Sequence, residues 1–258
     1  MASALARWSL EGQVALVVGG SRGIGRAIAE ALVDQGARVA IVSRSQQSVS
    51  NACSDIHSMG GEAIGIAADV GRLEDVVRFV QTATAKWGRI DVLINNAGIN
   101  PIWKRPENVD EADWDSIMGV NLKGAFFTCR EVGKQMISQR SGRIVSITSV
   151  TGLTGTARGL PYTAAKAGLH AMTQTLAADW SQHNIRINAV APGYVETDLT
   201  AAMRQNKGIY DSIAAKIPLG RFAQPAELVD LVTYLASEAS SYVTGQIFVA
   251  DGGYSAVR

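Results

Sequence analysis

Cysteine and histidine are scarce in this chain, with two cysteines and three histidines among 258 residues. Cys53 and Cys129 lie far apart and have no ligand-like neighbours, so we expect two buried or idle thiols. The histidines, His57, His170 and His183, do not follow the spacing of a metal site. The sequence therefore predicts neither a structural metal nor a disulfide.

Long apolar runs and net charge are also missing. No apolar stretch approaches the roughly 20 residues that span a bilayer. Residues 1–8 hold one arginine and lack the apolar core of a secretory signal. The formal net charge of +1 gives no general attraction to nucleic acid or to an anionic membrane. We therefore expect a soluble cytoplasmic protein that binds neither.

The chain is 47% hydrophobic and 18% charged, which suits one large α/β domain over residues 1–258. Strand patterns cover 14–18, 38–43, 62–67, 91–94, 142–148, 185–190 and 246–249. Helical patterns follow the first strand and then cover 46–59, 73–87, 113–140 (as one or two helices), 160–180 and 225–236. This alternation predicts a doubly wound fold, a seven-stranded parallel sheet with helices on both faces. The stretch 194–218 is too long for a plain connection, so we expect a small helical insertion or a lid there.

A glycine-rich turn follows the first strand, Val14–Val18. Glycines stand at positions 19, 20, 23 and 25, and apolar residues then recur at helical spacing. A strand, a tight glycine turn and a helix bring backbone N–H groups against a diphosphate. Taken alone, the turn also fits an ordinary connection between a strand and a helix.

Tyr162 and Lys166 stand four residues apart in the helical pattern 160–180, which places them on one helix face. Ser149 comes just after the fifth strand, at the carboxyl end of the parallel strands, where ligands bind. A phenol with a pKa of about 10 needs a nearby cation to act at neutral pH, and Lys166 supplies one. Together the three side chains suit hydride transfer, with Tyr162 moving the proton. Each alone also has a plain interpretation as a packing, solvated or capping residue.

The sequence resembles the classical short-chain dehydrogenase/reductase family, of the ketoacyl reductase or carbonyl reductase type, over almost its whole length. The matching motifs, in the family's order, are Gly19-x3-Gly23-x-Gly25, Asp69-Val70, Asn95-Asn-Ala-Gly98, Asn121, Ser149, Tyr162-x3-Lys166, Pro192-Gly193-x-Val195-x-Thr197 and Val249-Ala-Asp-Gly-Gly253. The resemblance implies a single Rossmann domain and an NAD(P)-dependent enzyme acting on CH–OH or C=O groups. It also implies four catalytic residues, namely Asn121, Ser149, Tyr162 and Lys166.

The resemblance also assigns cofactor contacts. These are Gly19, Ser21, Arg22, Gly23, Ile24, Gly25, Ser43, Arg44, Asp69, Val70, Asn96, Ala97, Gly98, Tyr162, Lys166, Pro192, Gly193, Val195 and Thr197. By this resemblance Asp69 bonds the adenine, Asn121 holds a water that links Lys166 to solvent, and Thr197 grips the carboxamide together with Val195. Asn95 is expected to brace the sheet instead. The family usually has threonine at position 18, and the valine here should weaken the turn by roughly 1 kcal/mol.

The residues after the second strand favour NADP(H) over NAD(H), with NAD(H) still possible. An acidic residue there would select NAD and repel a 2′-phosphate, but the chain has Ser43 and then Arg44. Arg44 and Arg22 can both pair with the phosphate. The alternative interpretation is that both arginines are solvated surface charges.

The substrate is a small molecule that the sequence narrows only to a class. Candidate pocket residues are Ser149, Tyr162, Trp103, Leu153 and Tyr194, with Asn100, Ile102, Leu199 and Met203 nearby. Most are apolar, and each can equally cap the core. Lys104 and Arg105 suit an anionic group or plain solvation. A ketone or β-keto ester, an acyl-carrier thioester and a polyol all stay open.

Two other functions remain. One is an NAD-dependent polyol or sugar alcohol dehydrogenase, and the other is a non-catalytic dinucleotide-binding protein on the same fold. The complete catalytic set disfavours the second. A related dehydratase or epimerase generally needs a longer substrate domain than this chain has room for.

The helices around 121–136 and 160–180 carry more small and apolar residues than one buried face needs. Members of the resembled family commonly pair at these helices, so we expect a homotetramer with two-fold axes.

Overall fold

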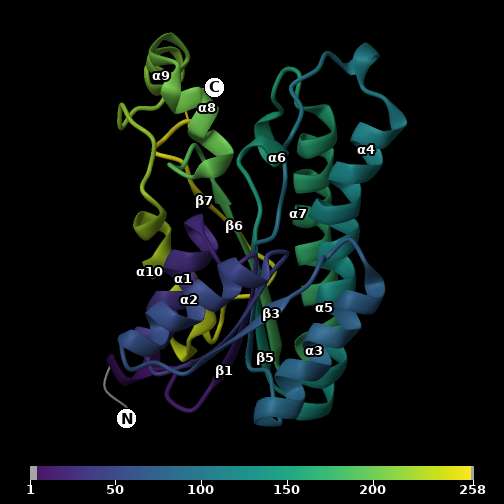
Figure 1. Ribbon diagram of the computed structural model, residues 1–258, viewed down its shortest axis with the longest axis vertical. Coiled ribbons are helices and arrows are strands. Elements are labelled where there is room, and N and C mark those ends of the chain that lie inside the picture. The colour runs from purple at the N-terminus through teal and green to yellow at the C-terminus, as the bar shows by residue number, and fades with distance from the viewer. Residues whose placement is uncertain (1–4, 257–258) are drawn as a thin grey trace.

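The computed structural model describes residues 5–256, in which seven strands form one parallel sheet in the order β3-β2-β1-β4-β5-β6-β7 (Figure 1). The strands are β1 (Val14–Val18), β2 (Arg38–Ser43), β3 (Ala63–Ala67), β4 (Val92–Asn95), β5 (Gly142–Ile147), β6 (Ile185–Pro192) and β7 (Ile247–Ala250). Each observed strand lies within two residues of its expected limits. The expected doubly wound, seven-stranded parallel fold is confirmed.

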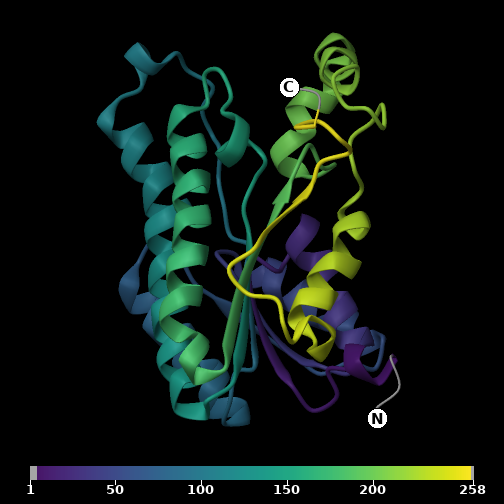
Figure 2. The ribbon, with the colours of Figure 1, turned by 180° about the vertical axis from the view of Figure 1, so that it is seen from behind.

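Helices cover both faces of this sheet. They are α1 (Gly23–Asp34), α2 (Gln46–Ser58), α3 (Leu73–Trp87), α4 (Glu111–Met118), α5 (Ala125–Gln139), α6 (Thr151–Thr154), α7 (Leu160–Trp180), α8 (Ala201–Gln205), α9 (Lys207–Ala214) and α10 (Val229–Ala236). Figures 1 and 2 show α3, α5 and α7 along one face and α1, α2 and α10 along the other. Short helical turns, such as Pro225–Leu228 before α10, link several of these elements.

The central strand β1 shows how the two layers share the sheet, because all five of its residues are buried. Ala15 and Val17 pack into the apolar cluster under α1, α2 and α10, whereas Leu16 and Val18 pack into the one under α3, α5 and α7. Successive side chains of a strand point to opposite faces, so a continuous apolar run is what a strand between two helical layers requires.

The pattern 113–140 forms one continuous helical rod with a wider turn inside it. Asp110 caps α4 by accepting a hydrogen bond from the backbone N–H of Asp113 at 2.8 Å. A π-helical turn, Gly119–Gly124, separates α4 from α5. A Cβ at Gly124 would lie 2.5 Å from the carbonyl oxygen of Val70, so glycine lets this turn approach the loop after β3. Such π turns often occur at functional sites, and this one contains Asn121.

The stretch 194–218 holds two short helices, α8 and α9, which project beyond the end of β6 (Figure 1). Of the two alternatives expected for this stretch, a small helical insertion and a lid, the observed helices fit the first, and a closing motion stays a prediction. A separate apolar cluster of Val150, Ile217, Phe222 and Tyr254 supports its base. The insertion consequently stands above the carboxyl end of the sheet.

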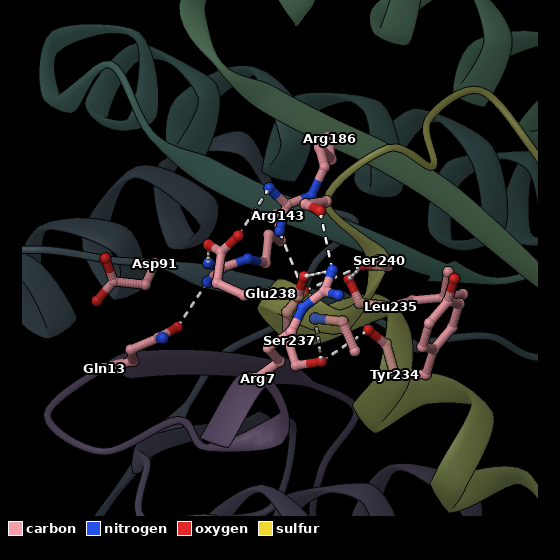
Figure 3. Close-up of polar contacts among 12 residues, drawn as sticks. Arg7, Gln13, Asp91, Arg143, Arg186, Tyr234, Leu235, Ser237, Glu238 and Ser240 are labelled. Carbon is pink, nitrogen blue, oxygen red and sulfur yellow. Dashed lines mark hydrogen bonds and ion pairs between the residues drawn. The ribbon is translucent and has the colours of Figure 1, made fainter. Parts of the chain in front are cut away.

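A polar cluster closes the opposite, amino end of β5 and β6 (Figure 3). Arg143 and Arg186 lie side by side on the two strands, and both form ion pairs with Glu238. Burial would raise the pKa of Glu238, but the two cations outweigh it and lower that pKa. Arg7 adds hydrogen bonds to the carbonyl of Glu238 and to Ser241. The cluster fastens the segment after α10 to the sheet, far from the carboxyl ends of the strands.

Candidate active site

The glycine turn after β1 is held by its neighbours in a fixed shape. The N–H groups of Gly19 and Gly20 donate to the carbonyl of Val42 on β2, at 2.7 and 3.3 Å. Gly19 has a φ of +79°, a conformation that glycine adopts readily. A Cβ on Gly25 would lie 2.2 Å from the carbonyl oxygen of Gly19, so α1 can pack this closely only with glycine there. The turn therefore presents the start of α1 to the space beyond the sheet.

The helix N-terminus at this turn has no side-chain cap. Arg22 occupies the capping position and makes no side-chain bond to the first helical N–H groups. The first four N–H groups of a helix have no partner within the helix, and they carry partial positive charge. This end of α1 is thus suited to an anionic group such as a diphosphate.

Two asparagines at the end of β4 brace this region. Asn95 is buried, and its Nδ2 donates to the carbonyl of Ala125 at 3.1 Å, so it supports the sheet as expected. Asn96 donates to the carbonyl of Gly19 at 2.8 Å and so ties the end of β4 to the glycine turn. The topological switch point of the sheet lies between β1 and β4, where doubly wound folds bind dinucleotides.

A cleft of about 960 Å³ runs along the carboxyl edge of the sheet. All the expected cofactor contacts line it except Gly25, which lies behind the turn. The expected catalytic residues Ser149, Tyr162 and Lys166 line it too, whereas Asn121 lies behind the wall. The sequence interpretation missed several lining residues, namely Ser45, Ser48, Ile99, Thr148 and Asp198. Of these, Ser45 carried a readable signal as a capping residue before the helix 46–59.

At the β2 end of the cleft, the two candidate phosphate-binding arginines differ. Arg22 forms an ion pair with Asp198 at 2.8 Å, and both side chains are 71% exposed. Arg44 makes no hydrogen bond or ion pair among residues 5–256. The Oγ atom of Ser43 is buried and has no hydrogen-bond partner within the same residues. Arg44 can therefore pair with an anion at this end of the cleft without first breaking an ion pair, whereas Arg22 would have to leave Asp198.

Ser149, Tyr162 and Lys166 come together at the middle of the cleft. The Nζ of Lys166 donates to the carbonyl of Ile147 at 2.9 Å and lies 5.6 Å from the centroid of the Tyr162 ring. Ser149 is hydrogen-bonded to Tyr162 and also accepts from the hydroxyl of Thr151 at 3.0 Å. The end of β5 thus supplies the serine, and the first turns of α7 supply the other two groups.

The electrostatics of this group differ from the expectation for Tyr162. Burial raises the pKa of the Tyr162 phenol to about 12, opposed only by its hydrogen bond with Ser149. Burial also lowers the pKa of Lys166 to about 8. The Tyr162 ring keeps partial exposure to the cleft, yet desolvation outweighs any help from the lysine. At neutral pH the phenol is consequently protonated and able to donate.

Asn121 acts on the loop after β4. Its Oδ1 accepts from the N–H of Ile99 and its Nδ2 donates to the carbonyl of Ile99, both at 2.8 Å. The side chain is fully buried in the π-helical turn. A Cβ on Gly98 would lie 3.5 Å from both Asn121 Oδ1 and Lys166 Nζ. Asn121 therefore lies beside Lys166 and fixes the cleft wall with both ends of its amide.

A second cavity of about 800 Å³ opens beside the first, under α8 and α9. The candidate substrate residues Trp103 and Tyr194 line this cavity, whereas Leu153 is 52% exposed and lines neither cavity. Further apolar lining comes from Ile102, Leu199, Ala202, Met203, Ile209 and Ile213. Lys216 is the charged residue in the lining. Lys104 instead forms ion pairs with Asp113 and Asp110, and its ammonium group does not line this cavity.

No helix within residues 5–256 is long and apolar enough to cross a membrane. The same residues hold no group of three or more candidate side chains that could bind a metal ion. Cys53 and Cys129 are both buried and unpaired.

Comparison with known proteins agrees with this geometry. The family described as Enoyl-(Acyl carrier protein) reductase matches residues 18–255. A 3-oxoacyl-[acyl-carrier-protein] reductase of Synechocystis is 39% identical over 249 residues, which cover 95% of this chain and 98% of that protein.

Two crystal structures have nearly the same fold. The structure of gox2181 gives a TM-score of 0.96 at 36% identity, with 98% of this chain and 99% of that one covered. A putative NAD(P)-dependent gluconate 5-dehydrogenase from Beutenbergia cavernae, with bound NADP, gives 0.92 at 38% identity, with 97% and 99% covered.

The fold and the cleft define a dinucleotide-dependent oxidoreductase. The chain belongs to the short-chain dehydrogenase/reductase family, whose relatives here are named dehydrogenases and reductases that act on alcohol and ketone groups.

Proposed function

We propose that this protein is an NADP(H)-dependent oxidoreductase that transfers a hydride between nicotinamide and a ketone or secondary alcohol. The observation that carries the proposal is the shared cleft. Ser149, Tyr162 and Lys166 open into the same space as the glycine turn and the uncapped end of α1. A proton donor and a dinucleotide cradle that share one cleft are what this reaction needs.

The residues present fit a dinucleotide. Glycine at position 19 lets the turn lie against the loop after β4, because a Cβ there would lie 2.9 Å from the backbone of Ala97. The buried Oγ of Ser43 offers an unused hydrogen bond at the ribose end. The start of α1 would hold the diphosphate, and Val195 and Thr197 would hold the carboxamide. Bound there, the cofactor supplies the hydride.

The chain's own residues supply the proton chemistry. Ser149 donates a hydrogen bond to the substrate oxygen and so orients it toward Tyr162. Tyr162 donates its phenolic proton to that oxygen in reduction and removes it in oxidation. Lys166 would bind the ribose hydroxyls of the cofactor, and its cation stabilises the phenolate that remains on Tyr162. Asn121 fixes the wall that carries Ile99. As the family resemblance implies, it would also hold a water through which protons pass between Lys166 and solvent.

Cofactor preference is the first prediction. Arg44 and Arg22 face a site without a carboxylate at position 43, so the enzyme should prefer NADPH over NADH about tenfold or more. Changing Ser43 to Asp together with Arg44→Ser should invert the preference. Lys86→Ser is the matched control, because it removes an exposed cation that does not line the cleft.

Turnover efficiency with each cofactor decides this point. Equal efficiency of the two cofactors in the unmodified protein would show that the arginines are only surface charges.

The second cavity favours a substrate with a largely apolar body, such as a β-keto ester or an acyl thioester. Its apolar wall comes mainly from Ile102, Leu199, Met203, Ile209 and Ile213, and polar groups of Asn100, Thr154 and Thr156 stand beside it. Lys216 is the observation that supports the second candidate, a sugar-acid dehydrogenase, because its ammonium group can pair with a carboxylate.

A substrate panel tests the proposed function directly. NADPH oxidation is followed with a medium-chain 3-oxo ester, its thioester, a cyclic ketone and 5-ketogluconate. We expect the apolar oxo compounds to give the higher kcat/KM. Turnover of the sugar acid alone would favour the second candidate, and no turnover of any carbonyl compound would overturn the proposal.

A further inference from the structure

His170 is a buried titratable group that the proposed chemistry does not use. It follows Tyr162 and Lys166 on α7 at the same four-residue interval, so the three side chains share one face of the helix. Its side chain is only 7% exposed. Buried polar side chains generally have a hydrogen-bond partner, and the partner here leads to the catalytic serine.

The partner of His170 is Thr148, the residue just before Ser149. His170 Nε2 lies 2.9 Å from Thr148 Oγ1. The Thr148 hydroxyl donates its one proton to the carbonyl of Val190 at 3.0 Å. The contact with His170 must therefore use a lone pair of the threonine oxygen, which makes His170 the donor and places its proton on Nε2.

The ring of His170 also supports the turn that follows Ser149. A Cβ on Gly152 would lie 2.8 Å from His170 Cε1 and 2.9 Å from the backbone nitrogen of Ala167. The N–H of Gly152 donates to the carbonyl of Ser149 at 3.0 Å. The segment 148–152 is thus fixed to α7 by a hydrogen bond before Ser149 and by close packing after it.

The charge state of His170 agrees with this role. Burial lowers its pKa, and the cation of Lys166 one turn away lowers it further. Lys166 is the charged group that faces the ring, and Thr148 faces it from the end of β5. A neutral imidazole donates one hydrogen bond without placing a second positive charge beside Lys166.

We propose that His170 is a positioning residue that holds Ser149 at the correct place relative to Tyr162. The proposal rests on the proposed function of those two groups. His170 acts through Thr148 and Gly152 and does not touch the substrate. Its removal should therefore disturb turnover without disturbing the dinucleotide end of the cleft.

Three variants test the proposal. His170→Leu removes the donor, His170→Gln keeps an N–H of similar reach, and Thr148→Val removes the acceptor. We expect His170→Leu and Thr148→Val each to lower kcat by about tenfold or more, because small displacements of a catalytic group are costly. NADPH affinity should stay within about twofold in both, since the cofactor contacts are unchanged. His170→Gln should recover most of the activity.

The double variant His170→Leu/Thr148→Val should be no slower than either single variant, because both remove one bond. His57→Leu is the matched control, since His57 makes a comparable bond to Ala63 on the far side of the sheet. An unchanged kcat in folded His170→Leu would overturn the proposal, as would equal losses of kcat and NADPH affinity.

Amide exchange provides a readout that does not need turnover. Exchange at residues 149–155 should be faster in His170→Leu and normal in His170→Gln. If the unmodified protein reduces no carbonyl compound, the proposed function fails alone, and this exchange still decides whether His170 positions the segment. Unchanged exchange in His170→Leu would refute the positioning role.

Discussion

Gly25 occupies a position in α1 where a single methyl group does not fit. The carbonyl oxygen of Gly19 and the Nδ2 of Asn96 would lie 2.2 and 2.5 Å from its Cβ. Gly25→Ala should therefore push α1 away from the turn, lower stability by about 1–3 kcal/mol and weaken dinucleotide binding. Gly119→Ala is the matched control, because nothing lies within 4 Å of a Cβ there.

Thermal unfolding and NADPH titration check this prediction. Equal effects of the two substitutions would mean that close packing at Gly25 does not shape the turn.

For single residues, the sequence predicted which side chains line the cleft better than it predicted their pKa values and ion pairs there. The spacing of Tyr162 and Lys166 placed them correctly, because helical periodicity is local. The pKa of Tyr162 could not be predicted from the sequence, since it depends on burial by segments distant in the chain. Arg22 was likewise expected as a free cation, but a partner 176 residues away holds it.

The segment from Thr197 to Ile217 is the element whose motion we expect to matter. Thr197 and Thr200 cap its first turn reciprocally, and Asp198 pairs with Arg22 on the glycine turn. A Cβ on Gly23 would lie 3.3 Å from Thr197 Cγ2, so the segment begins directly against α1. We predict that it closes over bound cofactor and substrate and excludes water from the hydride path.

Hydrogen exchange across 197–217 should slow when NADPH binds. Asp198→Asn should speed exchange near residues 197–200 by at most about fivefold, because an exposed ion pair contributes no more than about 1 kcal/mol. Asp211→Asn is the control, since Asp211 pairs with Lys207 inside α9. Exchange that ligands leave unchanged would contradict a closing role.

Elements were predictable where the apolar pattern is regular. All seven strands and the long helices were predicted from the pattern of apolar residues, because that pattern reflects which side chains are buried against the sheet. The helix α6, four residues long, gave no such pattern because tertiary contacts with α7 hold it. The continuous rod from α4 to α5 was also uncertain, since a π-helical turn shifts the phase of the apolar residues.

For the whole molecule, the outer surface of α4, α5 and α7 supports the proposal of a homotetramer. Trp114, Phe126 and Leu160 are 38%, 40% and 45% exposed on these three helices. Exposed aromatic and aliphatic groups gathered on neighbouring helices are typical of an interface between subunits. Closed oligomers of identical chains generally use two-fold axes.

Sedimentation at micromolar concentration tests this assembly. We expect a tetramer that Phe126→Asp dissociates into smaller species. Met59→Asp should leave it intact, because Met59 is an exposed apolar residue directly after α2, on the other face of the sheet. A monomer in the unmodified protein would refute the prediction.

The central claim is that Tyr162 moves the proton in a carbonyl reduction, and Tyr162→Phe tests it most directly. The ring stays and only the hydroxyl is lost, so NADPH affinity, measured by fluorescence, should change by less than about twofold. The steady-state kcat for the preferred ketone should fall by about 10²–10⁴, the range for losing a general acid. Tyr242→Phe, at a fully exposed position, should leave both values unchanged. Residual activity above about a tenth of the unmodified enzyme in Tyr162→Phe would contradict the account.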